Sequence, residues 1–385
     1  MGSDRSQGPD DGRSVVILTR TLKFGGAERQ IVLTARGLAA RGARVTVATF
    51  YPGGELEADL RDAPGVEVVS LDKRSRWDLV GFILRLRRLA RRGRPDVVYG
   101  VLFGPAWFAT IACLGTGVRR VWGLRGSSDA GVIDTRERRL IYRVTAWLSR
   151  FPHAILVNSE RGRRDYIAMG LRADRFHVIP NGFDVERWRP DPEAGAKLRE
   201  RWNVGSETRV LGLVGRVHPV KGHALLLDAA ARLLPTGIDF RVAFVGPDRS
   251  GHGGPLRERA KALGIADRVL WIDATDEMRA VYNAFDVSVC ASGSEGFPNV
   301  VGEAMACGRT CVTTDVGDAA ILLGGTGLVV PRQDPAAMAE ALRRALGWTR
   351  EERERRAAAA RARIVESYTI DRMIERTEAV LWPRG

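Results

Sequence analysis

Residues 287–308 read VSVCASGSEGFPNVVGEAMACG and contain the strongest signal of the chain's architecture. This stretch opens on a short apolar run at 287–289, which predicts a buried strand. Asn299 then offers a side chain that can cap a helix, and Gly308 is a typical residue at a helix end. The stretch therefore predicts a strand, a loop and a helix over 300–307, the repeating unit of a parallel α/β sheet.

Two carboxylates, Glu295 and Glu303, stand on either side of the turn and the start of this helix. We expect the amides of the first helical turn, those of Val301 and Gly302 among them, to be free to receive an anion such as a diphosphate. Glu303 can accept two hydrogen bonds from a vicinal diol such as a ribose. Glu295 precedes the turn and is placed to hold a second hydroxylated group, so the stretch predicts a site for an activated sugar.

Apolar, β-branched runs alternate with helical patterns along the rest of the chain, as expected for parallel sheets that helices cover on both faces. A first helix is expected over 27–41. The strands expected in the first half are 15–18, 45–48, 66–69, 96–99, 154–157 and 178–182. Those expected in the second half are 210–214, 240–245, 269–272, 287–289 and 311–313.

These two series of strands predict two doubly wound domains. The pattern is lost in the polar stretch 189–205, which indicates the boundary between them. We expect a disordered tail over 1–13, a first domain over 14–184 and a second domain over 185–365. The stretch 351–381 is rich in Arg, Glu and Ala and is expected to be helical.

The net charge of +14 is concentrated in the first half of the chain. Residues 1–184 hold 31 Lys and Arg against 19 Asp and Glu, whereas the remainder has a net charge of +2. The densest cluster, 85–94, is expected to be a helix with Leu86 and Leu89 buried. Its arginines are either a solvated helix face or a surface for anionic lipid headgroups or a polyanionic acceptor. Nucleic acid is not expected as a partner, because the cluster lacks interleaved aromatic residues.

Composition also predicts a cytoplasmic protein, with peripheral contact to the inner face of the membrane as an added expectation. No apolar run reaches the ~20 residues that a membrane-spanning helix needs, and the polar start has no hydrophobic signal segment. The cysteines lack the paired spacing of a zinc site, so we expect buried free thiols and no metal. They are Cys113, Cys290, Cys307 and Cys311.

Several motifs resemble, in order and approximate spacing, those of glycosyltransferase family 4, which contains retaining enzymes of GT-B fold. Glu295 and Glu303 lie seven residues apart within the Glu-Gly-Phe-Pro-Asn context of that family's signature. The other motifs are Gly-Gly-Ala-Glu-Arg at 25–29, Ile-Pro-Asn-Gly at 179–182, Gly-Arg at 215–216 with Lys-Gly at 221–222, and Thr-Asp-Val-Gly at 314–317.

The resemblance implies an α/β protein of GT-B fold, in which two Rossmann-like, doubly wound domains face each other across a cleft. The first domain, 14–184, would bind the acceptor, and the second, 185–365, would bind the nucleotide sugar. A C-terminal helix would cross back to the first domain within the segment 366–385, and we expect it over 368–382.

The resemblance also implies roles for individual residues. Arg216 and Lys221 would contact the donor's phosphates, Glu295 the hydroxyls of the donor sugar, and Glu303 the ribose. We expect catalysis to rest on Arg216, Lys221 and Glu295. The residues expected to bind the donor are Gly25, Gly26, Arg216, Lys221, Glu295, Phe297, Asn299, Val300, Val301 and Glu303.

Fixed cations can neutralise a leaving diphosphate without a divalent ion. No Asp-X-Asp triplet of the kind that holds a metal on a sugar nucleotide occurs in the sequence. We therefore expect metal-independent transfer, with no metal site and no cofactor beyond the donor substrate.

In the first domain, Gly25 and Gly26 open a helix, so the backbone there can approach a diphosphate or the transferred sugar. Many family members carry a His followed by Asp in the stretch that corresponds to 121–129, where this chain has no histidine. This difference makes other polar residues the candidate contacts for the sugar or the acceptor. These candidates are Arg125, Ser127, Asp129 and, beside Lys221, His218.

The resulting hypothesis is a retaining glycosyltransferase that moves a sugar from a UDP- or GDP-sugar to a glycan, lipid-linked or other hydroxyl acceptor in polysaccharide or glycoconjugate biosynthesis. Retention is implied only by the resemblance. Two enzymes of similar architecture, a sugar-nucleotide epimerase and a phosphorylase, are alternatives. A non-catalytic basic module that binds nucleotide or nucleic acid is an alternative of a different class.

Overall fold

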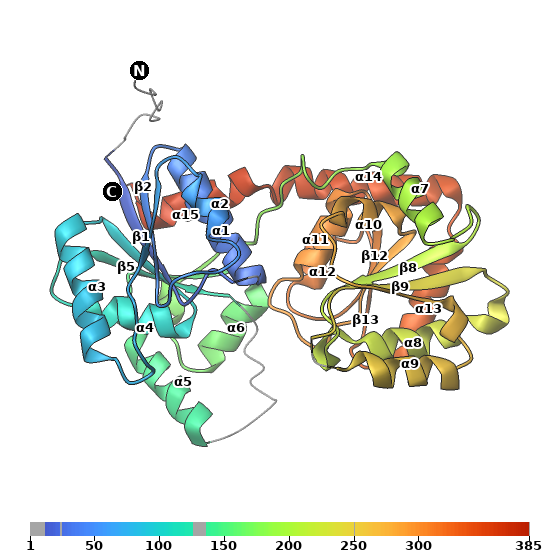
Figure 1. Ribbon diagram of the computed structural model, residues 1–385, viewed down its shortest axis with the longest axis horizontal. Helices are drawn as coiled ribbons and strands as arrows, with labels where there is room; N and C mark the ends of the chain where they lie inside the picture. The colour runs from blue at the N-terminus through green and yellow to red at the C-terminus, as the bar shows by residue number, and fades with distance from the viewer. Residues whose placement is uncertain (1–11, 24, 126–135, 250, 385) are drawn as a thin grey trace. The chain divides into compact units, whose positions relative to one another are not determined.

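The computed structural model describes residues 12–23, 25–125, 136–249 and 251–384. The chain forms two compact units, each built on its own parallel sheet (Figure 1). Unit 1 contains the chain up to Gly182 and the C-terminal segment Ile370–Gly385, and unit 2 is Phe183–Thr369. The predicted tail, 1–13, lies outside the described residues except for Gly12 and Arg13.

Unit 1 holds a seven-stranded sheet in the order β3-β2-β1-β4-β5-β6-β7, and all neighbouring strands are parallel. The order reverses between β1 and β4, as in a doubly wound sheet. The strands are β1 (Ser14–Thr19), β2 (Arg44–Thr49), β3 (Val66–Ser70), β4 (Val97–Val101), β5 (Arg119–Leu124), β6 (Ala154–Val157) and β7 (Phe176–Val178).

Helices cover both faces of this sheet because successive side chains of a strand point to opposite faces. From β1, Val15 and Ile17 pack in the core that α1 and α15 cover, whereas Val16 and Leu18 pack in the core that α3 and α4 cover. The helices are α1 (Gly26–Ala40), α2 (Ala58–Arg61), α3 (Val80–Gly93), α4 (Phe103–Ala112), α5 (Arg136–Leu148), α6 (Glu160–Ala168) and α15 (Ile370–Leu381), with a 3₁₀ turn η1 (Ala173–Arg175).

Unit 2 holds a six-stranded sheet in the order β10-β9-β8-β11-β12-β13, again with parallel neighbours. The strands are β8 (Arg209–Val214), β9 (Phe240–Val245), β10 (Val269–Ile272), β11 (Val287–Cys290), β12 (Thr310–Thr314) and β13 (Leu328–Val330). The helices are α7 (Pro192–Arg201), α8 (His223–Ala231), α9 (Gly253–Ala262), α10 (Met278–Ala284), α11 (Asn299–Ala306), α12 (Ala319–Leu323), α13 (Pro335–Leu346) and α14 (Arg350–Ser367). Three 3₁₀ turns, η2 (Pro219–Lys221), η3 (Leu234–Thr236) and η4 (Ala266–Arg268), complete the unit.

The predicted strands match observed ones except at one place. The short strand predicted at the start of 178–182 lies two residues earlier, because β7 ends at Val178 and Pro180 has no N–H to donate to a ladder. Two observed strands, β5 and β13, are absent from the predicted series. β5 begins with two charged residues, Arg119 and Arg120, which interrupt the apolar pattern of a buried strand. β13 has only three residues, too few to form a recognisable apolar run.

The polar stretch 189–205 does not separate the two units, because the chain divides between Gly182 and Phe183. It contains α7, which Asp191 caps by accepting a hydrogen bond from the Ala194 amide at 3.1 Å. The polarity of the stretch reflects an exposed helix face, while Leu198 is buried in the core of unit 2. Unit 2 instead begins at Phe183, whose N–H donates to the Tyr368 carbonyl at 2.8 Å.

The helical stretch predicted over 351–381 consists of two helices. α14 ends at Ser367 and belongs to unit 2, whereas α15 begins at Ile370 and belongs to unit 1. The break lies at residues 368–369, where Thr369 pairs with Phe183 in an isolated β-bridge.

The four cysteines are buried free thiols, as predicted. Burial raises the pKa of the Cys113 thiol to about 11 and that of Cys307 to about 12. Both thiols are therefore protonated at neutral pH. Within the described ranges, no helix combines the length and the apolar character needed to cross a bilayer.

Packing of α15 on α1 is the contact that ties the end of the chain to unit 1. Ile374 is 1% exposed and lies over Gly37, where a Cβ would collide with its side chain. We expect Ile374→Ala to lower the free energy of unfolding by about 2–5 kcal/mol, because it leaves a cavity under α15. Urea unfolding followed by circular dichroism measures this loss.

The exposed Arg376 on the same helix provides the control, since Arg376→Ala removes a side chain that lies outside the core. We expect it to change stability by less than about 0.5 kcal/mol. Equal stabilities of the two variants would show that α15 does not depend on this contact.

Candidate active site

The candidate site lies in unit 2, where the strand order reverses between β8 and β11. In doubly wound sheets, ligands bind beyond the carboxyl ends of the strands at this switch point. Two loops start there, 215–222 after β8 and 291–298 after β11. The Gly293 N–H donates to the Val220 carbonyl at 2.8 Å and so joins the two loops.

Lys221 and Glu295, both predicted site residues, meet across these loops. Lys221 Nζ lies 2.6 Å from Glu295 Oε1, and the Ser292 hydroxyl donates to the same oxygen at 2.7 Å. The side chains are 24% and 15% exposed, so the pair is partly shielded yet open to solvent. The structure thus brings together a cation and a carboxylate that 74 positions of sequence separate.

The approach of the two loops depends on a glycine. Gly222 has φ +71°, and a Cβ there would overlap the carbonyl oxygen of Ala291. A side chain at this position would therefore be strained and would push the loops apart. On the other side, Gly317 after β12 packs against the carbonyl groups of Glu295 and Gly296, where a Cβ would also collide.

Arg216 and His218 lie on the same loop as Lys221. The aliphatic part of the Lys221 side chain lies beside Gly215. Arg216, the next residue after Gly215, is exposed. In the described chain its guanidinium has no ion-pair or hydrogen-bond partner, so it can take a ligand. His218 Nδ1 accepts the Val220 N–H at 3.2 Å, which assigns this histidine a role in shaping the turn before Lys221.

Glu303 is held from the neighbouring helix. The Tyr282 hydroxyl on α10 donates to Glu303 Oε2 at 2.6 Å. Tyr282 is fully buried, and burial together with the nearby carboxylate holds the pKa of this tyrosine well above its ordinary value. It therefore stays a hydrogen-bond donor at any physiological pH and orients the carboxylate.

The start of α11 differs from the prediction in two respects. Asn299 is not the cap: Pro298 occupies the N-cap position and Asn299 is the first helical residue. The Val301 amide is not free, because it donates to the Pro298 carbonyl at 3.0 Å. The turn before the helix therefore provides the hydrogen-bond acceptor for the Val301 N–H that we expected from a capping side chain or a ligand. The end is as predicted, with Gly308 at φ +67° after Cys307.

Side chains predicted to bind the donor divide into two groups. Phe297 and Val301 are 6% and 1% exposed and belong to the core of unit 2, where the Phe297 ring stacks on Phe183 at 6.3 Å. Their apolar side chains support the loop from below and do not line it. Asn299 and Val300 are half-buried at the helix start.

The remaining predicted residues belong to unit 1. Gly25 precedes α1, and the Glu28 carboxylate occupies the space where its Cβ would be. Gly26 is the first residue of α1. Arg125 Nη1 donates to Asn181 Oδ1 at 2.8 Å, which links the end of β5 to the Ile-Pro-Asn-Gly motif. Ser127 and Asp129 lie outside the described residues.

Two hydroxyl groups of the site, those of Ser292 and Tyr282, were missed from the sequence. Ser292 lies three residues before Glu295, and this short spacing is a local signal that was available. Tyr282 lies on a different helix from Glu303, so no local pattern indicates it. Among the described residues, no group of three or more His, Cys, Asp and Glu side chains is arranged to hold a metal ion.

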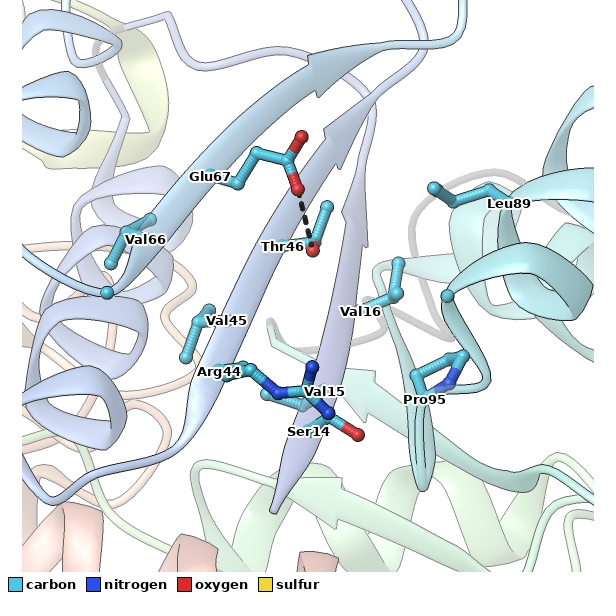
Figure 2. A pocket seen from close by; sticks show the side chains of 12 residues that line it. Ser14, Val15, Val16, Arg44, Val45, Thr46, Val66, Glu67, Leu89 and Pro95 are labelled. Carbon is cyan, nitrogen blue, oxygen red and sulfur yellow. Dashed lines mark hydrogen bonds between the residues drawn. The ribbon is translucent and has the colours of Figure 1, made fainter. Parts of the chain in front are cut away.

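A cavity of about 450 Å³ lies elsewhere, at the amino-terminal edge of the unit 1 sheet. Figure 2 shows it between the starts of the first three strands and the end of α3, with the Thr46 hydroxyl donating to Glu67 Oε2 at 3.5 Å. None of the predicted site residues lines it. Parallel strands point their carboxyl ends away from this edge, so the cavity does not belong to the candidate site.

Comparison with known proteins relates the chain to one family. A family model described as "Glycosyltransferase Family 4" matches residues 24–187, and one described as "Glycosyl transferases group 1" matches residues 208–347. The D-inositol 3-phosphate glycosyltransferase of Acidothermus cellulolyticus is 30% identical over 355 residues, which cover 84% of this chain and 78% of the relative. That of Frankia alni is 32% identical, over 84% of this chain and 86% of the relative.

With other relatives the match is shorter and spans about half of their length. It covers 52% of the D-inositol 3-phosphate glycosyltransferase of Nocardia farcinica, at 35% identity over 58% of this chain. It covers 40% of the putative glycosyltransferase EpsF of Bacillus subtilis, at 31% identity over 40% of this chain.

Solved structures share the fold. Anabaena Alr3699/HepE, crystallised in complex with UDP, has a TM-score of 0.84 at 23% identity, over 96% of this chain and 99% of that one. Sucrose-phosphate synthase from Thermosynechococcus elongatus has a TM-score of 0.80 at 18% identity, over 96% and 98% of the two chains. The predicted fold class, GT-B, is therefore confirmed. Both its motifs and its relatives show that the chain belongs to glycosyltransferase family 4.

Proposed function

We propose that this chain is a retaining, metal-independent glycosyltransferase that moves a sugar from a UDP- or GDP-sugar to a hydroxyl acceptor. The observation that carries the proposal is the meeting of Lys221 and Glu295 at the switch point of unit 2, 2.6 Å apart. A donor molecule brings a diphosphate and a hydroxylated sugar to one place, and these two residues offer a cation and a carboxylate there.

Transfer requires that the negative charge growing on the leaving diphosphate be neutralised. In our proposal the donor phosphates replace the Glu295 carboxylate as the partner of Lys221. The exposed Arg216, on the same loop, also binds these phosphates. Glu295 keeps the hydroxyl of Ser292 and accepts hydrogen bonds from hydroxyls of the donor sugar. The ion pair is partly open to solvent, with side chains 24% and 15% exposed, so the donor phosphates can reach Lys221.

Glu303 is proposed to bind the ribose. A carboxylate has about four lone-pair sites, so the bond from Tyr282 leaves acceptor capacity for a vicinal diol. With one oxygen held by a buried hydroxyl, the carboxylate plane is set before the donor arrives. Such preorganisation lowers the entropic cost of binding.

Retention in this proposal follows from transfer on one face of the donor, with the leaving phosphate accepting the acceptor's proton. That route depends on stabilising the diphosphate and needs no protein nucleophile. The acceptor is a glycan, a lipid-linked sugar or another hydroxyl compound. Several relatives are named for D-inositol 3-phosphate, which makes this compound one candidate acceptor.

The direct test is incubation of the purified protein with UDP-, GDP- and ADP-sugars and a panel of acceptors that includes D-inositol 3-phosphate. We expect release of a nucleoside diphosphate that requires both donor and acceptor and that continues in EDTA, because fixed cations hold the phosphates. An obligatory need for inorganic phosphate would indicate a phosphorylase. Conversion of the sugar nucleotide without acceptor would indicate an epimerase, and activity lost in EDTA and restored by magnesium would contradict metal independence.

Lys221→Ala is expected to lower kcat/KM for transfer by about 10²–10³-fold, since it removes a charge that stabilises the leaving diphosphate. Lys197→Ala is the matched control, because Lys197 Nζ also lies 2.6 Å from a carboxylate, that of Glu193, but on an exposed face of α7. The control should keep wild-type turnover. Unchanged turnover in Lys221→Ala would remove this lysine from the diphosphate site.

Tyr282→Phe is expected to raise the KM for the donor about tenfold with little change in kcat, because it removes one hydrogen bond to a charged group that binds the ribose. Steady-state kinetics with the donor varied separates the two constants. Tyr99→Phe, at an equally buried tyrosine of unit 1, is the control. A fall in kcat at unchanged KM would contradict a ribose-orienting role.

A further inference from the structure

Three adjacent helices form one layer on a single face of the unit 1 sheet (Figure 1). α3 and α4 share a core with Val16 and Leu18 of β1. α4 and α5 share the next core, with Trp122 of β5 and Ile155 of β6. The outer surfaces of the three helices are therefore neighbours, and we call them the α3–α4–α5 face.

Large apolar side chains lie exposed on this face. Trp77, just before α3, is 74% exposed, and Val80 and Leu84 on α3 are 72% and 55% exposed. The further members are Leu79 before α3, Ile111 and Leu114 at the end of α4, and Leu140, Ile141, Val144 and Trp147 on α5. Ten of the fourteen large exposed apolar side chains of the described chain thus belong to one layer.

The spacing of these exposed apolar residues places them on a second apolar stripe, separate from the stripe that each helix buries in the core. On α3 the buried stripe is Phe82, Leu86 and Ala90, while Val80 and Leu84 repeat four apart on the opposite side. On α5, residues 140, 144 and 147 likewise fall on one side of the helix. In unit 2 the exposed apolar residues lie singly on four different elements, as is normal for a surface.

The charges of the face are mainly positive. The described side chains of α3 and α5 include seven arginines and no acidic residue, and Asp78, just before α3, pairs with Arg85. Arg88, Arg91 and Arg92 are exposed on α3. The guanidinium groups of Arg76 and Arg150 lie over the rings of Trp77 and Trp147, at 4.7 and 5.9 Å.

The combination of exposed apolar side chains and arginines indicates which kind of partner can bind the α3–α4–α5 face. A second copy of the chain would place two arginine-rich faces against each other, and their repulsion opposes a symmetric dimer. An anionic bilayer fits both the charges and the apolar side chains of the face. Its phosphates attract the arginines, and its interface accepts tryptophan and aliphatic side chains.

We propose that the α3–α4–α5 face binds peripherally to an anionic lipid bilayer, with Trp77, Val80, Leu84 and the apolar stripe of α5 inserted among the headgroups and the arginines at the lipid phosphates. The proposal concerns unit 1 alone and does not depend on the transferase reaction.

The test is co-flotation of the full chain with vesicles of phosphatidylcholine alone or with one third phosphatidylglycerol. We expect binding to the anionic vesicles, weakened by salt, and little binding to the neutral ones. The triple variant Trp77→Ser, Val80→Ser, Leu84→Ser keeps every arginine and should weaken binding by about tenfold or more, because it removes the inserted groups. The triple variant Arg88→Gln, Arg91→Gln, Arg92→Gln should cause a loss of about the same size through the charges.

The matched control removes three exposed apolar residues from unit 2, in the variant Leu234→Ser, Ile321→Ser, Val365→Ser. It should bind vesicles as the wild type does, and circular dichroism verifies that all variants fold. Absence of binding to anionic vesicles at low salt would overturn the proposal. Wild-type binding by the apolar triple variant would overturn insertion, and a solution dimer that this variant dissociates, without vesicle binding, would assign the face to a second copy.

Discussion

The contact between the loops after β8 and β11 is the constraint on which the candidate site depends. Gly222, at φ +71°, lets one loop lie directly against the Ala291 carbonyl of the other, and the Gly293 amide joins them at 2.8 Å. This approach brings the Lys221 ammonium to the Glu295 carboxylate. A side chain at position 222 would separate the loops and with them the two charges, so the chemistry of the site rests on a backbone conformation that glycine adopts readily.

Each carboxylate of the Glu-X₇-Glu motif is held by one hydroxyl group. Ser292 donates to Glu295 from the same loop, and Tyr282 donates to Glu303 from a neighbouring helix. Both hydroxyl groups belong to buried residues, since Tyr282 is 0% and Ser292 2% exposed. Both leave acceptor capacity on the carboxylates, which is what a polyhydroxylated ligand requires. The site therefore offers two oriented acceptor carboxylates, of which Glu295 lies beside the Lys221 cation.

Local signals predicted the fold well because most of them act through neighbouring residues. Apolar, β-branched runs located the strands, and Gly308 marked the end of α11. Errors arose where a different local interaction took over. Pro298 occupies the N-cap position expected for Asn299, and its carbonyl accepts the Val301 amide, while the polar stretch 189–205 contains a helix, α7. Phe297 belongs to the core of unit 2, and its neighbours Gly296 and Pro298 are buried as well.

Residue types and short spacings are enough to predict the alternation of strands and helices, the basic character of the first half, the buried thiols and the motifs of the family. The pairing of groups becomes visible in the folded chain: Lys221 meets Glu295 across 74 positions, and Tyr282 meets Glu303 from a separate helix. The folded structure also shows which apolar residues of α3 and α5 are exposed to solvent. The physical reason is that such pairings and exposures depend on how loops and helices pack on the sheet, and packing joins residues whose distance along the chain carries no signal.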